Sequence, residues 1–313
     1  MDDVLAVGTA LVDILVGQVN QIPDPGDLKL VTQFGVATGG VASTFARDCA
    51  RLGLATGLVA SVGNDPLGEL LIRELKSDGV RLRQIRHDER LATGGSVVLI
   101  NSNGERSFLH LPGASIQIAS PELVDVTKCR HLHLGGTPLL PEYDGPRGEA
   151  LFRRARLHGV TTSFDTIMNE SGWEQTRRLL PFTDIAMPSY EEAFLLTGYR
   201  DPADQAHFLL QAGARIAVVK LGSEGAWIAD ADRAFMAIPS EEIKAIDTTG
   251  AGEAFCAGFV YGLLFDWNLE KTAAFATACG SLATQAVGGP TAIESLEKVL
   301  KWLDRYPVTL RQI

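Results

Sequence analysis

Residues 247–255, which read Asp-Thr-Thr-Gly-Ala-Gly-Glu-Ala-Phe, form a glycine-rich turn that leads into a long apolar stretch. Gly250 and Gly252 let the main chain approach an anion closely, and the first helical turn has N–H groups without helical partners. The helix dipole adds partial positive charge there, which favours a phosphate. Glu253, beside this cradle, is a group that can take a proton from an attacking hydroxyl. The turn therefore predicts phosphoryl transfer to an alcohol.

Two known phosphate motifs share part of this pattern. The turn is not a Walker A loop, because no Gly-Lys-Ser/Thr follows, and Phe255 stands where a dinucleotide fingerprint has its third glycine. That fingerprint also belongs to the first strand–turn–helix unit of its fold, whereas this turn lies near residue 250. The pattern alone leaves open an ordinary glycine-rich start of a buried helix.

Composition narrows the classes of partner. The 313 residues are 46% hydrophobic, which allows one large α/β domain or a domain with an appendage. The net charge of −10 argues against nucleic acid and anionic membranes as partners. The longest apolar run, 254–265, is too short to span a bilayer, and the start of the chain lacks signal-peptide features. The four cysteines show no CxxC spacing, so we expect buried free thiols and a cytoplasmic location.

After residue 115 the sequence alternates between apolar strand patterns and helical patterns. This alternation predicts a doubly wound, mostly parallel α/β sheet covered by helices on both faces. Strands without intervening helices, in segments of about 11–37 and 90–112, predict a small β-sheet lid inserted into one domain that spans 1–313. The sequence Ser102-Asn103-Gly104-Glu105 is typical of a hairpin turn inside the second segment. Expected strands are 4–7, 11–16, 30–36, 56–61, 93–100, 106–111, 131–134, 161–164, 185–187, 216–220, 226–229 and 233–238, and expected helices include 39–52, 66–77, 252–265, 269–286 and 293–304.

Five motifs in order resemble those of the ribokinase-like, or PfkB, carbohydrate kinases over nearly the whole chain. They are Gly39-Gly40 with Ala46, Ala50 and Leu52-Gly53; the run 62–68; Ser189 to Glu192; the run 218–225; and the glycine turn at 247–255. The resemblance implies an ATP-dependent kinase that uses Mg²⁺ and acts on a hydroxymethyl group of a sugar or sugar-like molecule. It leaves open activation by a monovalent cation.

The same resemblance implies roles for individual residues. The substrate hydroxyls would contact Asp13, Gly39 and Gly40, with Thr44 at a further sugar position. Gly250, Ala251 and Gly252 would form the anion hole, and Glu253 would be the catalytic base. Lys220, Gly222, Gly225 and Asp247 would lie at the nucleotide, and Glu192 would act near Mg²⁺ through its water shell.

The chain departs from the family pattern at three of these positions. Glu253 replaces the usual aspartate, and the extra methylene moves the carboxylate by about 1.5 Å, a shift that can cost on the order of 100-fold in rate. Its alternative role is to stabilise the helix dipole. Thr44 replaces an asparagine and has fewer hydrogen-bonding groups, so it is either a sugar contact or a residue of the helix without a ligand. Ser189 and Glu192 also fit a helix capping box without any metal.

Other residues leave similar alternatives. Asp165 ends a strand at the edge where α/β sheets bind ligands, so it is either a substrate or phosphate contact or a turn residue. Asp13 lies in an apolar run, where an unpaired charge is costly, which favours a functional role. His131 and His133 share one face of a strand, and we expect buried, hydrogen-bonded histidines rather than a metal site.

The lid segments and the departures suggest two further hypotheses. Strand 11–16 is apolar on both faces, so a homodimer through an exposed lid face is expected. Phe34 and Phe108 are the aromatic residues of the lid segments, which gives little support to a nucleoside kinase as the alternative enzyme. The unusual residues at 44, 189 and 253 motivate a second alternative, a ligand-binding or regulatory homologue with weakened catalysis.

Overall fold

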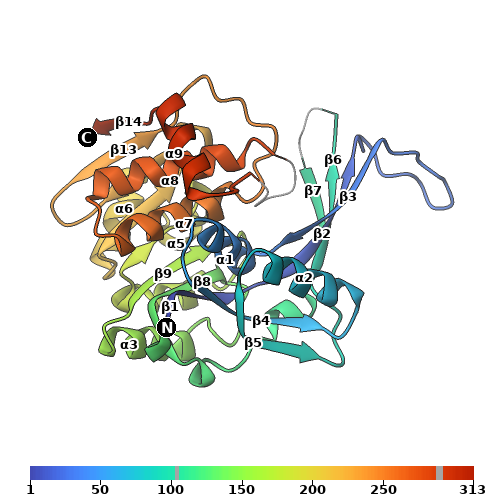
Figure 1. The fold of residues 1–313 in the computed structure, drawn as a ribbon, viewed down its shortest axis with the longest axis horizontal. Helices are drawn as coiled ribbons and strands as arrows, with labels where there is room; N and C mark the ends of the chain where they lie inside the picture. The colour runs from blue at the N-terminus through green and yellow to red at the C-terminus, as the bar shows by residue number, and fades with distance from the viewer. Residues whose placement is uncertain (103–105, 287–291) are drawn as a thin grey trace.

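Two β-sheets organise the chain (Figure 1). The computed structural model describes residues 1–102, 106–286 and 292–313. The large sheet has the strand order β14-β13-β12-β11-β10-β9-β8-β1-β4-β5, and a four-stranded sheet, which we call the lid, has the order β3-β2-β6-β7 and projects from the main body. The large sheet is parallel from β11 to β5 and antiparallel from β11 to β14. The predicted doubly wound fold with a small separate sheet is confirmed.

The elements have the following bounds. The large sheet contains β1 (Asp2–Gly8), β4 (Thr56–Gly63), β5 (Arg81–Asp88), β8 (Cys129–Thr137), β9 (Thr161–Thr166), β10 (Ile185–Ala186), β11 (Ile216–Lys220), β12 (Ala226–Ala229), β13 (Ala234–Ile238) and β14 (Thr309–Gln312). The lid contains β2 (Leu11–Gly17), β3 (Gln33–Gly39), β6 (Gly95–Ile100) and β7 (Arg106–Leu111). The α-helices are α1 (Val41–Arg51), α2 (Pro66–Ser77), α3 (Pro146–Leu157), α4 (Trp173–Arg177), α5 (Tyr190–Thr197), α6 (Pro202–Gln211), α7 (Ala251–Leu264), α8 (Leu269–Ala283) and α9 (Leu296–Arg305).

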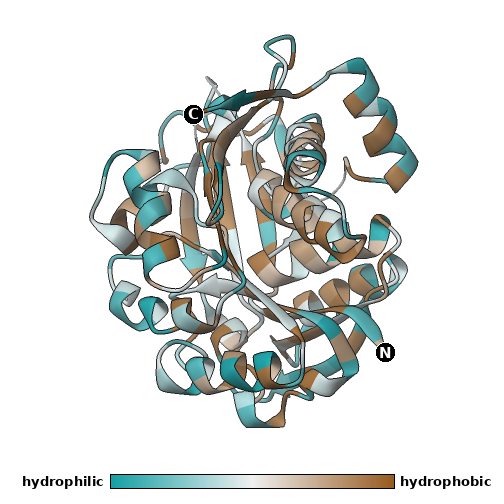
Figure 2. Ribbon diagram, turned by 90° about the vertical axis from the view of Figure 1, so that its left-hand side faces the viewer, coloured by the Kyte–Doolittle hydropathy of each residue, from teal (hydrophilic) through white to brown (hydrophobic). Residues whose placement is uncertain are grey.

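The two faces of the large sheet support separate hydrophobic cores. Side chains alternate across a strand, so Val4 and Ala6 of β1 enter one core and Leu5 and Val7 enter the other. The first core is completed by helices α1, α2, α7, α8 and α9, and the second by α3 to α6. Figure 2 shows the hydrophobic residues concentrated on the sheet and on the helix faces turned toward it. None of the helices in the described ranges is long and apolar enough to cross a bilayer.

Local sequence explains where several helices begin and end. Helix α2 spans the predicted residues, because the Asp65 carboxylate caps the N–H of Gly68 at 2.8 Å and Pro66 occupies the first turn. Helix α8 stops at Ala283, three residues before its predicted end, and α9 begins at Leu296 after the capping Ser295 rather than at residue 293. The capping Ser295 side chain therefore sets the start of α9 more strictly than hydrophobic periodicity does.

Some strand predictions were wrong. Strand β3 begins at Gln33 rather than at residue 30, since Gln33 is the partner of Gly17, the last residue of β2. Strands β5 and β14 were not predicted, because both lie at sheet edges. The face of β2 that was expected to be exposed includes Val12, which is buried in the first core, and Ile14, which is half-buried. The predicted hairpin turn at 102–105 lies mostly outside the described residues, although β6 and β7 do pair antiparallel.

Candidate active site

A cleft of about 960 Å³ lies at the carboxyl edge of the parallel strands. It is lined by residues from the ends of β9 and β11, from the first turn of α7 and from α8. This edge is where open α/β sheets bind ligands, since side chains that end neighbouring strands converge there. The cleft brings together these candidate residues: Asp165, Glu192, Lys220, Gly222, Gly225, Ala251, Gly252 and Glu253.

The glycine turn forms the entrance to α7. Gly250 is the residue before the helix and has a φ of 78°, a left-handed conformation that glycine adopts without strain. The buried Asp247 accepts a hydrogen bond from the Thr249 N–H at 2.7 Å, which fixes the turn just before it. Asp247 and Gly250 do not line the cleft, so they shape the turn from behind while Ala251 and Gly252 face the cavity.

Lys220 extends to the same helix start. A β-carbon placed on Gly252 would lie 3.1 Å from the Lys220 Nζ, so the missing side chain is what lets the ammonium approach the main chain. The helix N-terminus and a fixed cation thus present positive charge to one part of the cleft. Such a site favours a phosphate.

Lys220 and Asp165 form a buried ion pair. The Lys220 Nζ lies 2.6 Å from the Asp165 Oδ1, which also accepts the Thr166 N–H at 2.8 Å. The Cys256 Sγ lies 3.5 Å from the Asp165 Oδ2 and 3.9 Å from the ammonium. Burial alone would lower the pKa of Lys220, but the Asp165 carboxylate outweighs it and raises that pKa, so the ammonium stays charged. The sequence placed Lys220 along the nucleotide, and the structure adds Asp165 as its partner.

Glu253 lies in the first turn of α7 at the edge of the cleft. Burial and the Asp165 carboxylate raise the pKa of its carboxyl, the Lys220 ammonium opposes both effects, and the resulting pKa is about 7. A general base works best when its pKa is close to the operating pH. The arrangement therefore gives Glu253 the proton affinity that a base at neutral pH needs.

Glu192 occupies a capping box at the start of α5. Its Oε2 accepts the Ser189 N–H at 2.9 Å, and the Ser189 side chain caps the helix in return, so the capping alternative is confirmed. The same Oε2 accepts the Thr166 hydroxyl at 2.6 Å. The residue nevertheless lines the cleft, so capping leaves it available to a ligand. Within the described ranges no group of three or more His, Cys, Asp and Glu side chains could hold a metal on its own.

Asp13, Gly39 and Gly40 lie at the base of the lid and Thr44 lies on α1, and none of these four candidate substrate residues lines the cleft, whereas the fifth, Asp165, does. Asp13 is on β2, and a β-carbon on Gly39 would lie 2.5 Å from its Oδ2, so the carboxylate rests over the Gly39 main chain. Gly40 has a φ of 100° and no room for a side chain beside the Thr9 carbonyl. The next residue, Val41, begins α1 and does line the cleft. Thr44 is buried one turn further along α1.

Gly222 and Gly225 form the turn between β11 and β12. Their φ values are 61° and 91°, and a β-carbon on Gly225 would lie 2.0 Å from the Ala237 carbonyl oxygen. No other residue fits at Gly225 without displacing β13. Both glycines line the cleft on the side of the antiparallel strands, together with Ser223 and Glu224 between them.

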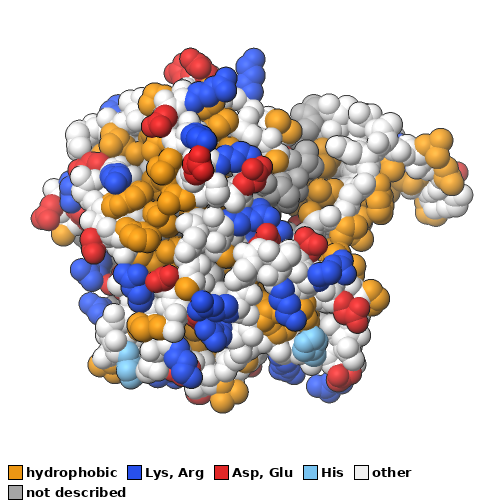
Figure 3. All heavy atoms as spheres, in the orientation of Figure 1, with side chains coloured by type: hydrophobic (Ala, Val, Ile, Leu, Met, Phe, Trp, Pro, Cys, Tyr) orange, Lys and Arg blue, Asp and Glu red, His pale blue; other side chains and the backbone are white. Residues whose placement is uncertain are grey.

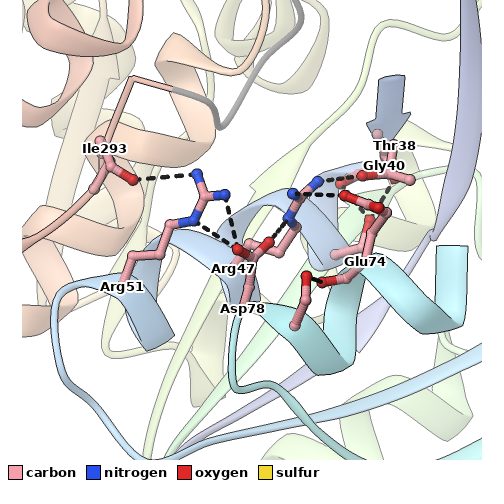
Figure 4. A network of polar contacts seen from close by, with 10 residues as sticks. Thr38, Gly40, Arg47, Arg51, Glu74, Asp78 and Ile293 are labelled. Carbon is pink, nitrogen blue, oxygen red and sulfur yellow. Dashed lines mark hydrogen bonds and ion pairs between the residues drawn. The ribbon is translucent and has the colours of Figure 1, made fainter. Parts of the chain in front are cut away.

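A charged network connects the lid base to the main body (Figure 4). The buried Arg47 of α1 contacts the Thr38 hydroxyl at the end of β3 and the Asp78 carboxylate that follows α2. Arg51 lies 2.8 Å from the same carboxylate and donates to the Ile293 carbonyl at 3.2 Å. Because one carboxylate joins two arginines, the network holds β3, α1 and α2 in a fixed relation.

The histidine and cysteine predictions have separate outcomes. His131 contacts the Thr161 and Ser163 hydroxyls at 2.8 and 2.7 Å, and it is buried as expected. His133 contacts Ser163 at 2.7 Å, but its Nε2 is without a partner among the described residues, so it is only partly hydrogen-bonded. All four cysteines are buried free thiols, as predicted.

Three residues of the site's surroundings were missed. Thr166 anchors Glu192, and Cys256 adjoins the Asp165–Lys220 pair. Asp48 is a fully buried carboxyl of α1, and neither of its oxygens has a hydrogen-bond partner in the described structure. Burial raises the pKa of Asp48 well above its usual value, with the nearby Glu253 carboxylate contributing. A signal existed, because Asp48 lies four residues after Thr44 and so shares its helix face.

Comparison with known proteins defines the class of protein. Residues 1–296 match the family model described as pfkB family carbohydrate kinase, and the chain belongs to this family. It is therefore a sugar or nucleoside kinase, and its relatives are carbohydrate kinases. The five-motif resemblance in the sequence is confirmed.

Individual relatives are moderately similar and full-length. The chain is 29% identical to 2-dehydro-3-deoxygluconokinase of Bacillus subtilis over 89% of this chain and 90% of the relative. It is 30% identical to an ATP-dependent ribose-1-phosphate kinase of Halopiger xanaduensis, over 92% and 94%. Aminoimidazole riboside kinase of Salmonella typhimurium is 28% identical, over 94% and 92%.

Solved structures share the fold. A putative ribokinase II of E. coli in complex with ATP and Mg²⁺ superimposes with a TM-score of 0.84 at 25% identity, covering 97% of this chain and 100% of that one. Arabidopsis thaliana ribokinase complexed with ribose and ATP has a TM-score of 0.83 at 25% identity, covering 96% and 98%. The first of these structures holds ATP and Mg²⁺, and the second holds ribose and ATP.

Proposed function

We propose that this protein transfers the γ-phosphoryl group of ATP to a hydroxymethyl group of a sugar or sugar-like molecule, with Glu253 as the base. The substrate oxygen attacks the γ-phosphorus, the bond to the bridging oxygen of ADP breaks, and the hydroxyl proton passes to the Glu253 carboxylate. The observation that carries the proposal is the joint position of Glu253, Gly252 and Lys220 in one cleft, with the pKa of Glu253 raised to about 7.

The phosphate chain would lie against the start of α7. The main-chain N–H groups of Ala251 and Gly252 would form the anion hole, with Gly250 shaping the turn behind them, and the Lys220 ammonium adds a fixed positive charge. The volume of the cleft, about 960 Å³, falls within the range of nucleotide-sized sites. Gly222 and Gly225 supply part of the wall for the nucleotide, and Asp247 orders the turn.

Mg²⁺ would bind with the nucleotide rather than to the protein alone. The described residues offer no three-ligand cluster, which fits an ion that keeps most of its waters and binds phosphate oxygens. Glu192 lines the cleft beside Asp165 and would hold waters of that shell. When bound, the ion neutralises the charge that develops on the phosphate oxygens.

The acceptor would lie between the cleft and the lid. Asp13 and the main chain of Gly39 and Gly40 would contact its hydroxyls, with Thr44 below them on α1. Asp165 would contact the acceptor or the transferred phosphate, since its carboxylate lines the cleft between Lys220 and Cys256. The relatives named above include kinases of a sugar acid, a sugar phosphate and a nucleoside.

ATP turnover with a panel of sugars, sugar acids and nucleosides tests the proposal, with each assay run in K⁺ and in Na⁺ to detect a monovalent-cation requirement. Stimulated ADP release by at least one compound is expected. Tight nucleotide binding without turnover by any compound would instead support a ligand-binding homologue, which the unusual Glu253 motivates. Glu253→Asp then separates the two cases, because a slow enzyme gains activity and an inactive homologue does not.

We also propose a homodimer through the lid. The lid carries exposed apolar side chains on one face, including Phe34, Val36, Leu109 and Leu111, with exposed fractions of 69%, 51%, 60% and 55%. Figure 3 shows hydrophobic side chains along the projecting lid. Sheet faces of this kind are usually covered by a partner.

Sedimentation of the wild-type chain and of Leu109→Glu tests this dimer. The wild type should sediment as a dimer and Leu109→Glu as a monomer. The matched control is Leu157→Glu, since Leu157 is 80% exposed on α3 of the main body. A monomeric wild type, or equal behaviour of both variants, contradicts the lid interface.

A further inference from the structure

Strand β9 ends in two polar residues that face opposite sides of the sheet. Successive side chains alternate across a strand, so Asp165 reaches Cys256 of α7 and Thr166 reaches Glu192 of α5. Asp165 and Thr166 are only 2% and 5% exposed, and both line the cleft. The end of β9 therefore connects the wall formed by α7 with the wall formed by the start of α5.

Thr166 holds the carboxyl groups on both sides of the strand. Its N–H donates to the Asp165 Oδ1 at 2.8 Å, and its hydroxyl donates to the Glu192 Oε2 at 2.6 Å. The second distance is typical of a charge-assisted bond between a hydroxyl and a carboxylate, which is roughly twice as strong as a neutral hydrogen bond. One residue of β9 thus fixes both groups.

This arrangement leaves Glu192 one oxygen for a ligand. Its Oε2 receives two donors, the Thr166 hydroxyl and the Ser189 N–H at 2.9 Å. Its Oε1 accepts no hydrogen bond from the described residues, and that atom is not sealed from solvent as the Asp48 oxygens are. Because Glu192 lines the cleft, Oε1 is the oxygen that it presents there.

We propose that Thr166 is a positioning residue for the divalent cation, because its hydroxyl turns the Glu192 carboxylate so that Oε1 faces the water shell of nucleotide-bound Mg²⁺. The inference rests on the proposed function and deepens it on the metal side of the cleft. Mg²⁺ keeps several of its waters in such sites, and a fixed carboxylate is ready to accept hydrogen bonds from them. Without the hydroxyl, only the Ser189 N–H would hold Oε2, and the carboxylate would rotate more freely. Groups that orient the surroundings of a metal typically contribute about 10–100-fold to its affinity.

Thr162 separates this role from a purely structural one. It lies on the same face of β9, one turn of the pleat and more before Thr166, and is fully buried. Its hydroxyl donates to the Phe182 carbonyl at 2.7 Å, and it does not line the cleft. Thr162→Val therefore removes a buried hydroxyl from the same strand without reaching Glu192.

Binding of Mn²⁺ to the protein with saturating ADP, measured by electron paramagnetic resonance, tests the role without catalysis. Thr166→Val should weaken Mn²⁺ binding about tenfold, whereas Thr162→Val should bind Mn²⁺ as the wild type does. Thr166→Ser keeps the hydroxyl and should restore the wild-type affinity. ADP affinity in the presence of EDTA should be the same in all four proteins, because Thr166 acts on the cation alone. Thr166→Ala takes the place of the valine variant if the latter does not fold.

Three results overturn the role of Thr166: wild-type Mn²⁺ affinity in Thr166→Val, equal weakening in Thr162→Val, and no recovery in Thr166→Ser. The proposed kinase activity stands in each of these cases. If the wild type binds no Mn²⁺ with ADP but phosphorylates an acceptor, this inference fails alone. If it binds no Mn²⁺ and phosphorylates no compound of the panel, the proposed function fails with it.

Discussion

The ionisation of Glu253 should control how activity depends on pH. The pKa of this carboxyl is raised to about 7, and the base must be ionised to accept the substrate proton. At pH 6 about one tenth of the carboxyl is ionised, so kcat/KM should be about a tenth of its plateau at higher pH. Activity is thus lost as the pH falls through 7, one proton per active site.

Asp165→Asn should move this acidic limb. Asp165 is the neighbouring carboxylate that contributes most to the raised pKa of Glu253, and Lys220 opposes it. Without the Asp165 charge, the effect of the Lys220 ammonium on Glu253 is no longer offset by that carboxylate. The pKa of Glu253 should therefore fall by about one unit. Relative to its own plateau, the variant's kcat/KM at pH 6 should then rise about fivefold, from a tenth to a half.

The assay is a kcat/KM profile from pH 5 to 9 at saturating MgATP, with the best acceptor of the panel. Asp144→Asn is the matched control. Burial raises the pKa of Asp144 to about 6, and its carboxylate accepts from the Thr137 hydroxyl and from the Leu140 N–H outside the cleft. The control should leave the limb near 7. A limb that stays in place in Asp165→Asn, or that moves in Asp144→Asn, refutes the assignment to Glu253.

Two further perturbations test the lid base. Asp78→Asn removes the carboxylate that Arg47 contacts, and Arg47 has a side-chain exposure of only 6%, so the variant should lose about 3 kcal/mol of unfolding free energy in urea. Gly39→Ala places a β-carbon 2.5 Å from the Asp13 Oδ2 and should displace that carboxylate. We expect KM for the acceptor to rise about tenfold, the value of one lost hydrogen bond, with little change in unfolding.

Matched variants control both tests. Asp125→Asn breaks an exposed pair with Lys128, so its unfolding transition in urea should match that of the wild type. Gly35→Ala lies on the same strand as Gly39 and has open space at its β-carbon, so its KM should equal that of the wild type. If either control matches its test variant, the local contacts do not explain the effect.

The helices and buried strands were predictable because local signals agreed with the fold. Helix α2 has its capping Asp65 and first-turn Pro66. Helix α7 follows a glycine turn in which Gly250 adopts a left-handed conformation. The edge strands β5 and β14 were not predictable from hydrophobicity. Leu82 and Ile85 are the two apolar residues of β5, and all four residues of β14 are exposed, so only pairing with β4 and β13 defines these strands.

The sequence predicted the individual residues of the site better than the contacts between them. Glycine spacing and strand ends indicated Glu253, Lys220 and Asp165 separately, but their meeting in one cleft depends on strand order. The Lys220–Asp165 pair joins residues 55 positions apart, and no local pattern encodes such a contact. The segment from Ser189 to Glu192 matched a capping box in sequence, and the structure contains that box. The capping pattern by itself did not predict that Glu192 lines the cleft.

The central claim is that Glu253 removes the acceptor proton while the start of α7 holds the phosphoryl group. Single-turnover transfer from ATP to the best acceptor, compared between wild type, Glu253→Gln and the exposed control Glu191→Gln, tests it most directly. We expect Glu253→Gln to slow transfer by about 10²–10⁴-fold with unchanged ADP affinity and Glu191→Gln to behave as the wild type. Transfer by Glu253→Gln within about threefold of the wild-type rate would contradict it.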